Sequence, residues 1–229
     1  DHLAGKHTVG VYPLLEDDSC YFLAMDLDEA DWREDARAIM LSCAELEIPA
    51  ALEISRSGKG AHVWVFFVSR VSARDARRLG SAIISHTCAR SRQLKLGSYD
   101  RLFPNQDSMP KGGFGNLIAL PLQKGPREKD FSVFVDAKLA PYPDQWAFLD
   151  SIQLMPPHDI EPTILQATGN VHPLDVTFID DEDLLTPWKR ENTATKKLSG
   201  PMPTLLNVTV ANLIYFEKAQ LPQALANRL

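Results

Sequence analysis

Residues 50–68, AALEISRSGKGAHVWVFFV, form the stretch of the chain that decides its fold. The runs AALEIS (50–55) and AHVWVFFV (61–68) are short and apolar, and the second is rich in β-branched and aromatic residues, which is typical of β-strands. The intervening SGKG favours a turn, because glycine adopts backbone conformations that other residues avoid. The stretch therefore predicts a β-hairpin with a glycine-rich tip.

The segments on either side of this hairpin show both strand and helix patterns. Strands are predicted over 8–14, 20–25, 116–122 and 131–135, and helices over 31–46, 72–91 and 144–152. Asp31 and Ser72 are the expected N-caps of the two longer helices. The order is irregular and places several strands next to one another in the chain. It predicts a mixed α/β (α+β) fold with antiparallel neighbours, and it excludes a regular βαβ winding.

The composition is typical of a soluble globular protein, with a hydrophobic fraction of 45% and a charged fraction of 24% over 229 residues. No apolar run approaches the roughly 20 residues that span a bilayer, and no signal-peptide pattern opens the chain, so we expect a cytoplasmic protein. Cys20, Cys43 and Cys88 are far apart and form no CxxC pair. They predict buried reduced thiols and no zinc site.

Two parts of the chain differ in character. Residues 1–155 hold the predicted strands and helices, and we expect them to form one catalytic domain. Residues 156–204 are rich in proline and acidic residues, as in MPPHDIEP and IDDEDLLTP, and the stretch from Leu205 is apolar. We therefore expect 156–229 to be a connection and a C-terminal segment that lead to further domains in a longer protein.

The charge distribution is uneven. The net charge is −6, yet residues 52–124 contain twelve Lys and Arg against four Asp and Glu. This local excess indicates a basic face for a polyanionic partner. Arg74, Arg77 and Arg78 belong to a predicted helix, so a solvated helix face explains them equally well.

Asp26 and Asp28 follow an apolar strand in the motif MDLD. Alternate residues of a strand point to the same face, so the two carboxylates are expected side by side. Such a pair repels unless cations neutralise it, and the hard ions Mg²⁺ and Mn²⁺ prefer oxygen ligands. Two ions held in this way can activate an attacking hydroxyl and stabilise a departing pyrophosphate. The alternative is a pair of strand-end aspartates in solvent.

The hairpin tip offers a hydroxyl, an ammonium group and an imidazole, from Ser57, Lys59 and His62, together with exposed backbone N–H groups. Gly58 and Gly60 allow a close approach to a phosphate. The tip is not a Walker A loop, because no helix follows and Gly60 precedes Ala61 instead of lysine. A simple turn would need the glycines but not the three polar side chains.

The ordered set DLD (26–28), SGKGAH (57–62) and YD (99–100) resembles the three signature motifs of the archaeo-eukaryotic primase superfamily. The wider surroundings are similar to the primase-polymerase domain of the TOTE conflict systems, over roughly residues 6 to 150. These surroundings read GVYPLLEDD, AMDLD, EISRSGKGAHVWVFF, YDRLFPNQD and GFGNLIALPLQ.

The resemblance implies a catalytic sheet of the RNA-recognition type packed with a smaller αβ unit, with the active site in the cleft between them. It implies that Asp26, Asp28 and Asp100 bind two Mg²⁺ or Mn²⁺ ions. Val135-Asp136 also fits the third motif. We prefer Asp100, because a glycine-rich stretch and a further strand follow it. The nucleotide-binding candidates are Ser57, Gly58, Lys59, Gly60, His62 and Lys124, and the DNA-binding candidates are Arg74, Arg77, Arg78, Arg101, Gln106 and Lys111.

The implied activity is template-directed joining of nucleoside triphosphates on single-stranded or primed DNA, as in a DNA primase-polymerase. In that family the domain is accompanied by helicase and nuclease modules, which are the expected partners. Two alternatives stay open. One is a gap-filling repair polymerase that extends primers without initiating them, and the other is a catalytically idle nucleic-acid-binding module in which the acids are structural.

Overall fold

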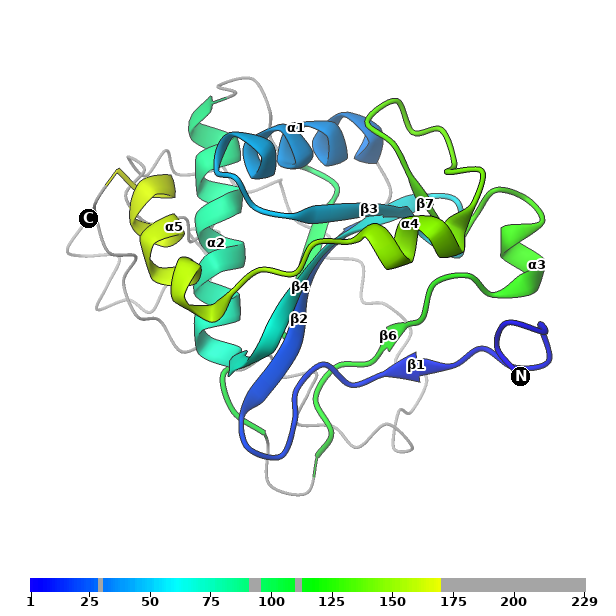
Figure 1. Cartoon of the computed structure of the whole chain (residues 1–229), viewed down its shortest axis with the longest axis horizontal. Helices are drawn as coiled ribbons and strands as arrows, with labels where there is room; N and C mark the ends of the chain where they lie inside the picture. Colours follow the sequence, from blue (N-terminus) through cyan, green and yellow to red (C-terminus); the bar gives the residue numbers. More distant parts are fainter. Residues whose placement is uncertain (29–30, 91–95, 110–112, 170–229) are drawn as a thin grey trace, which may run out of the picture.

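The computed structural model describes residues 1–28, 31–90, 96–109 and 113–169 (Figure 1). Its centre is a five-stranded antiparallel sheet with the order β5-β2-β4-β3-β7. The strands are β2 (Ser19–Asp28), β3 (Ala50–Ile54), β4 (Gly60–Ser72), β5 (Tyr99–Phe103) and β7 (Val133–Val135). The predicted hairpin is confirmed as β3 and β4, and the mixed α/β class is confirmed with it.

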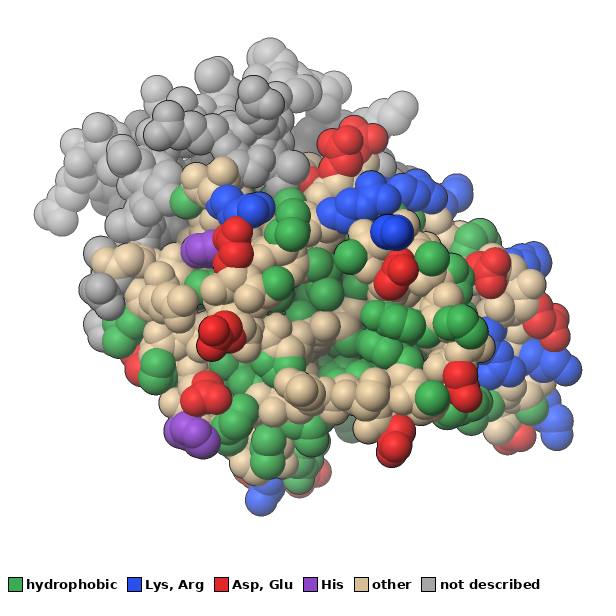
Figure 2. Space-filling model, turned by 45° about the horizontal axis from the view of Figure 1, so that its top comes forward, with side chains coloured by type: hydrophobic (Ala, Val, Ile, Leu, Met, Phe, Trp, Pro, Cys, Tyr) green, Lys and Arg blue, Asp and Glu red, His purple; other side chains and the backbone are tan. Residues whose placement is uncertain are grey.

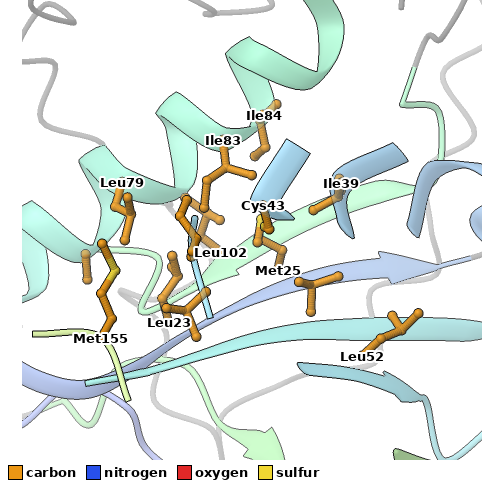
Figure 3. Packing of buried hydrophobic residues seen from close by; sticks show 14 of the residues in the cluster. Leu23, Met25, Ile39, Cys43, Leu52, Leu79, Ile83, Ile84, Leu102 and Met155 are labelled. Atoms are coloured by element: carbon orange, nitrogen blue, oxygen red, sulfur yellow. The ribbon is translucent and has the colours of Figure 1, made fainter. Parts of the chain in front are cut away.

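One face of the sheet is covered by the helices α1 (Trp32–Glu45) and α2 (Ala73–Arg90). Leu23, Met25 and Leu27 of β2 alternate along the strand and are fully buried on this helix face. Figure 3 shows Leu23 and Met25 with their neighbours, packed between the sheet and the two helices. Burial of a leucine-sized side chain stabilises a fold by about 1.5–3 kcal/mol, so this face supplies most of the hydrophobic core.

The two expected helix caps differ in outcome. Ser72 Oγ accepts a hydrogen bond of 3.0 Å from the Asp75 backbone N–H, which confirms Ser72 as the cap of α2. Asp31 occupies the N-cap position of α1, as predicted, but its side chain makes no capping hydrogen bond. Its φ of −91° and ψ of 48° depart from the extended conformation of a capping residue, so its carboxylate does not reach the first turn.

The opposite face carries a second, smaller layer (Figure 1). β1 (Gly10–Val11) pairs with β6 (Ile118–Ala119), and Val11 and Ile118 pack against Ala24, Trp64 and Phe103 of the central sheet. α3 (Lys124–Arg127) and α4 (Gln145–Ser151) lie in the connections around this layer. The strands predicted over 8–14 and 116–122 are thus much shorter, because only two residues of each pair with one another.

The last described elements are the 3₁₀ turn η1 (Pro157–Asp159) and α5 (Ile160–Ala167), which packs against α2. Ile160 and Ile164 are buried in the core of the helix face. The expected domain boundary at residue 155 stays a prediction, and residues 170–229 lie outside the described part. None of the helices in the described ranges is long and apolar enough to cross a membrane.

A candidate active site on the acidic face of the sheet

The strand register aligns five residues, one from each strand, in a row across the central sheet. Asp26 of β2 pairs with His62 of β4 on one side and with Arg101 of β5 on the other. His62 in turn pairs with Glu53 of β3. The complete row reads Arg101, Asp26, His62, Glu53 and Phe134. We call the side of the sheet that carries this row the acidic face.

His62 lies between two carboxylates. Its Nδ1 is 2.9 Å from Glu53 Oε2, and its Nε2 is 3.4 Å from Asp26 Oδ1. Burial alone would lower the pKa of His62, but the neighbouring carboxylates of Asp26 and Glu53 outweigh it and raise that pKa to about 10. The side chain is therefore a cation at neutral pH, held in a fixed place on the sheet.

Glu53 is a functional candidate that the sequence motifs did not identify. It is 1% exposed, and its Oε2 accepts hydrogen bonds of 2.9 Å from both His62 Nδ1 and Trp64 Nε1. Its signal in the sequence is an acid inside the apolar run AALEIS. A buried carboxylate needs donors or cations around it, and here it has both.

The glycines of the hairpin tip are required by its shape. A Cβ on Gly60 would lie 2.2 Å from the Leu27 carbonyl oxygen, so β2 and β4 could not approach as they do. Gly58 has a φ of +72°, and the Phe131 ring covers the position of its missing Cβ at 2.5 Å. Within the tip, Ser57 Oγ accepts a hydrogen bond of 3.1 Å from the Lys59 backbone N–H.

Asp100 lies in a β-bulge of β5, next to β2. Arg101 pairs with Asp26 and Tyr99 with Leu27, so Asp100 is the extra residue between them. Its Oδ2 is 2.8 Å from Arg101 Nε. Burial raises the pKa of Tyr99 beside it, so that phenol is neutral.

Asp136 follows β7, which is separated from β2 by two intervening strands. At about 4.8 Å per strand, this places it on the order of 14 Å from the strand of Asp26. Its Oδ1 accepts hydrogen bonds from the backbone N–H groups of Lys138 (2.8 Å) and Ala140 (2.9 Å). Asp136 thus stabilises a turn at the far edge of the sheet.

A buried contact from α1 fixes the chain just before Asp100. Asp35 accepts hydrogen bonds from the backbone N–H (3.0 Å) and the hydroxyl of Ser98. The Ser98 carbonyl accepts one of 2.7 Å from the backbone N–H of Asp28. The segment that carries Asp100 is therefore tied to both α1 and the end of β2.

A family model described as TOTE conflict system, Archaeo-Eukaryotic Primase domain, matches residues 1–163. The chain belongs to this family. No curated protein matches the chain. Membership places this primase-family domain in a superfamily of nucleotidyltransferases, whose members typically use divalent metals and act on nucleotides and nucleic acids.

The primase-family domain brings its three motif acids to neighbouring strands, but they do not form a closed metal cage. Among the described residues, no group of three or more His, Cys, Asp and Glu is placed to hold a metal ion. Asp26 contacts His62, and Asp100 contacts Arg101. Side-chain cations thus lie next to the carboxylates of Asp26 and Asp100. The donor set itself, three aspartates and no thiol, suits Mg²⁺ or Mn²⁺.

The predicted DNA-binding arginines of α2 lie on the helix face, opposite the acidic face. Arg77 pairs with Asp107, and Arg78 Nη1 is 2.8 Å from Glu161 Oε2 and 3.2 Å from Asp75 Oδ1. Carboxylates therefore compensate the charges of these two side chains. The assignment of Arg74, Arg77 and Arg78 to DNA stays a prediction.

The remaining candidates are Gln106, Lys124 and Lys111. Gln106 is buried, and its Nε2 has no hydrogen-bond partner among the described residues. Lys124 begins α3 beside Gly5, whereas Lys111 lies outside the described residues. Figure 2 shows Lys and Arg side chains gathered at the end of the molecule where α3 and the N-terminus lie.

Proposed function

We propose that this domain is a template-directed nucleotidyltransferase, a DNA primase-polymerase that joins nucleoside triphosphates on a DNA template. The observation that carries the proposal is the row across the sheet. It sets the partly buried cation His62 against Asp26, beside the strand that carries Asp100. An anionic substrate with bound metal cations needs positive groups for the substrate and negative groups for the cations, within a few ångströms of one another.

Asp26, Asp28 and Asp100 are the proposed ligands of two Mg²⁺ or Mn²⁺ ions. Such ions, when bound, lower the pKa of the attacking hydroxyl and offset the charge on the leaving pyrophosphate. Asp100 fits the third position better than Asp136, because β5 neighbours β2 and the Asp136 carboxylate is already used in a turn. The hydrogen bond from Asp28 to Ser98 supports this choice, since it holds the two acid-bearing segments together.

The chain's own residues would bind and orient the triphosphate. His62 offers a fixed cationic donor, and charge-assisted hydrogen bonds to phosphate are among the strongest that side chains make. Lys59 is in the adjacent tip, whose conformation depends on Gly58 and Gly60. The basic α3 end, which includes Lys124, is a second source of positive charge near the tip, because Phe131 joins the two by packing on Gly58.

A primer-extension assay tests the proposal. The purified chain is given a DNA template with and without a primer, each nucleotide class in turn, and Mg²⁺, Mn²⁺ or a chelator. Metal-dependent incorporation that follows the template supports the proposal. Extension of primers without synthesis on the unprimed template would favour a gap-filling polymerase. Template binding without incorporation under every condition would favour an idle binding module.

A further inference from the structure

We propose that Glu53 is a positioning residue for the triphosphate site, because its buried carboxylate holds the His62 ring with Nε2 directed to the side of Asp26. This role rests on the proposed function and deepens it. Glu53 itself is 1% exposed and lies behind His62, so it does not touch the substrate. It acts through the imidazole.

The first support is the bonding of the Glu53 carboxylate. Oε2 accepts from His62 Nδ1 and from Trp64 Nε1, each at 2.9 Å. A fully buried carboxylate in the middle of a sheet is costly unless donors surround it. An apolar residue at this position would stabilise the sheet without such partners. The presence of an acid at position 53 is therefore explained by its holding of two donors, His62 and Trp64. Of these two, His62 faces the proposed site.

The second support is that Trp64 is rigidly held. It is 2% exposed and belongs to an apolar cluster with Ala24, Ala51 and Phe103. Its ring stacks on Phe66 with 5.8 Å between centroids and 5° between planes. The indole N–H consequently donates from a fixed point, so the Glu53 oxygen that it contacts has little freedom to move.

The third support is that the two ring nitrogens of His62 make different contacts. Nδ1 is committed to Glu53 at 2.9 Å, whereas the 3.4 Å separation of Nε2 from Asp26 Oδ1 is long for a hydrogen bond. Nε2 therefore keeps the capacity to donate to another acceptor, such as a phosphate oxygen. The rings of Trp64 and His62 form a T-shaped pair, with 83° between planes and 5.8 Å between centroids, so the indole also packs against the imidazole.

A double-mutant cycle tests this role. The dissociation constant of a non-hydrolysable nucleoside triphosphate is measured in the presence of Mg²⁺ for the parent, Glu53→Gln, His62→Ala and the combined variant. Glu53→Gln has nearly the shape of the parent side chain but removes the charge. We expect it to weaken binding roughly tenfold, and to change binding less than about twofold when His62 is already alanine, because residues that act as a unit are not additive.

Controls separate the positioning role from general damage. Glu34→Gln removes an exposed acid from α1, on the helix face, and should leave the dissociation constant unchanged. Trp64→Phe removes one donor to Glu53 and keeps an aromatic ring, so it should weaken binding by roughly threefold in the same His62-dependent way. Trp64→Phe also replaces Glu53→Gln in the test if the latter fails to fold. If Trp64→Phe still weakens triphosphate binding when His62 is already alanine, the proposal is overturned.

The outcomes also distinguish this role from the proposed function. Parent-like binding by Glu53→Gln, together with weakened binding by His62→Ala, overturns the positioning role alone. Losses that simply add in the combined variant overturn it as well, because they make Glu53 an independent structural residue. A parent chain that binds no triphosphate at all overturns the proposed function and this role together.

Discussion

The two faces of the central sheet are built from the same strands but serve different ends. On β2, Leu23, Met25 and Leu27 point to the helices and are fully buried among apolar side chains. Asp26 and Asp28 alternate with them and point the other way. Because the side-chain period of a strand is two, one continuous segment supplies both the core and the candidate site.

The acidic face differs from the helix face in how it accommodates buried groups. Glu53 is nearly as buried as the core leucines and His62 is partly buried, with 12% of its side chain exposed, yet both are polar and they are linked by a hydrogen bond. Their places are set by a specific register and not by hydrophobicity alone. The comparison teaches that losses on the helix face should appear as lost stability, whereas losses on the acidic face should appear as lost substrate binding or chemistry.

The largest expected effect concerns the choice of third acid. Asp100→Asn removes the charge of a proposed metal ligand beside β2. The lost transition-state stabilisation of about 3 kcal/mol or more corresponds to a drop in incorporation on the order of a hundredfold or more. Asp136→Asn, at the far edge, should change incorporation by less than about threefold and affect mainly its turn. Single-turnover extension rates measure both, and the reverse ranking would move the metal site to β7.

The next effect tests the helix face. Leu23→Ala should lower the free energy of unfolding by about 2–5 kcal/mol, because it leaves a cavity beneath α2. Asp26→Ala, three residues along the same strand but on the other face, should lower it by less than about 1 kcal/mol, since His62 keeps Glu53 as a partner. Chemical denaturation of the metal-free variants measures both. Similar losses would remove the distinction between the faces.

A moderate effect is expected for His62→Ala. The lost charge-assisted contacts should cost about 1.5–3 kcal/mol, which is roughly a tenfold or larger weakening of triphosphate binding. Affinity for the DNA template should be preserved. Titration calorimetry with the triphosphate, and fluorescence anisotropy with single-stranded DNA, measure the two separately. Release of the template with normal triphosphate affinity would make the tip a template contact.

The smallest effect concerns the basic helix α2. If Arg74 contacts the template backbone, Arg74→Gln should lower the log–log salt slope of single-stranded DNA binding by about 0.7. Arg33→Gln on α1 is the matched control, since it removes an exposed arginine from the other helix. Equal slopes for the two variants would mean that α2 only covers the core and that the template lies along the acidic face.

Local pattern was sufficient to predict much of the fold. The run AALEISRSGKGAHVWVFFV predicted β3, β4 and their tip, and apolar spacing predicted α1 and α2 within a few residues of their ends. The order of the strands was beyond such reasoning. Periodicity indicates which residues share a face, but not that β5 pairs with β2 while β7 lies at the opposite edge.

The candidate site was predicted from sequence motifs more than from physical reasoning about the residues. The three acids and His62 came from recognisable motifs, and their common location depends on pairings over a long stretch of chain. Glu53 was missed because one acid in a five-residue strand is equally consistent with a solvent-facing position. Only its register with His62, and the indole of Trp64, give that carboxylate a role. Asp35 was missed for a similar reason, since its partner Ser98 is far away in sequence.

The central claim is that the acidic face carries metal-dependent nucleotidyl transfer, and one measurement tests it most directly. Template-directed incorporation is compared for the parent, Asp26→Ala/Asp28→Ala, and the exposed-acid control Glu34→Ala, with Mg²⁺ or Mn²⁺ and with folding checked by circular dichroism. The account predicts that the parent and the control incorporate nucleotides only with metal, and that the folded double variant does not. Near-normal incorporation by the folded double variant would contradict it.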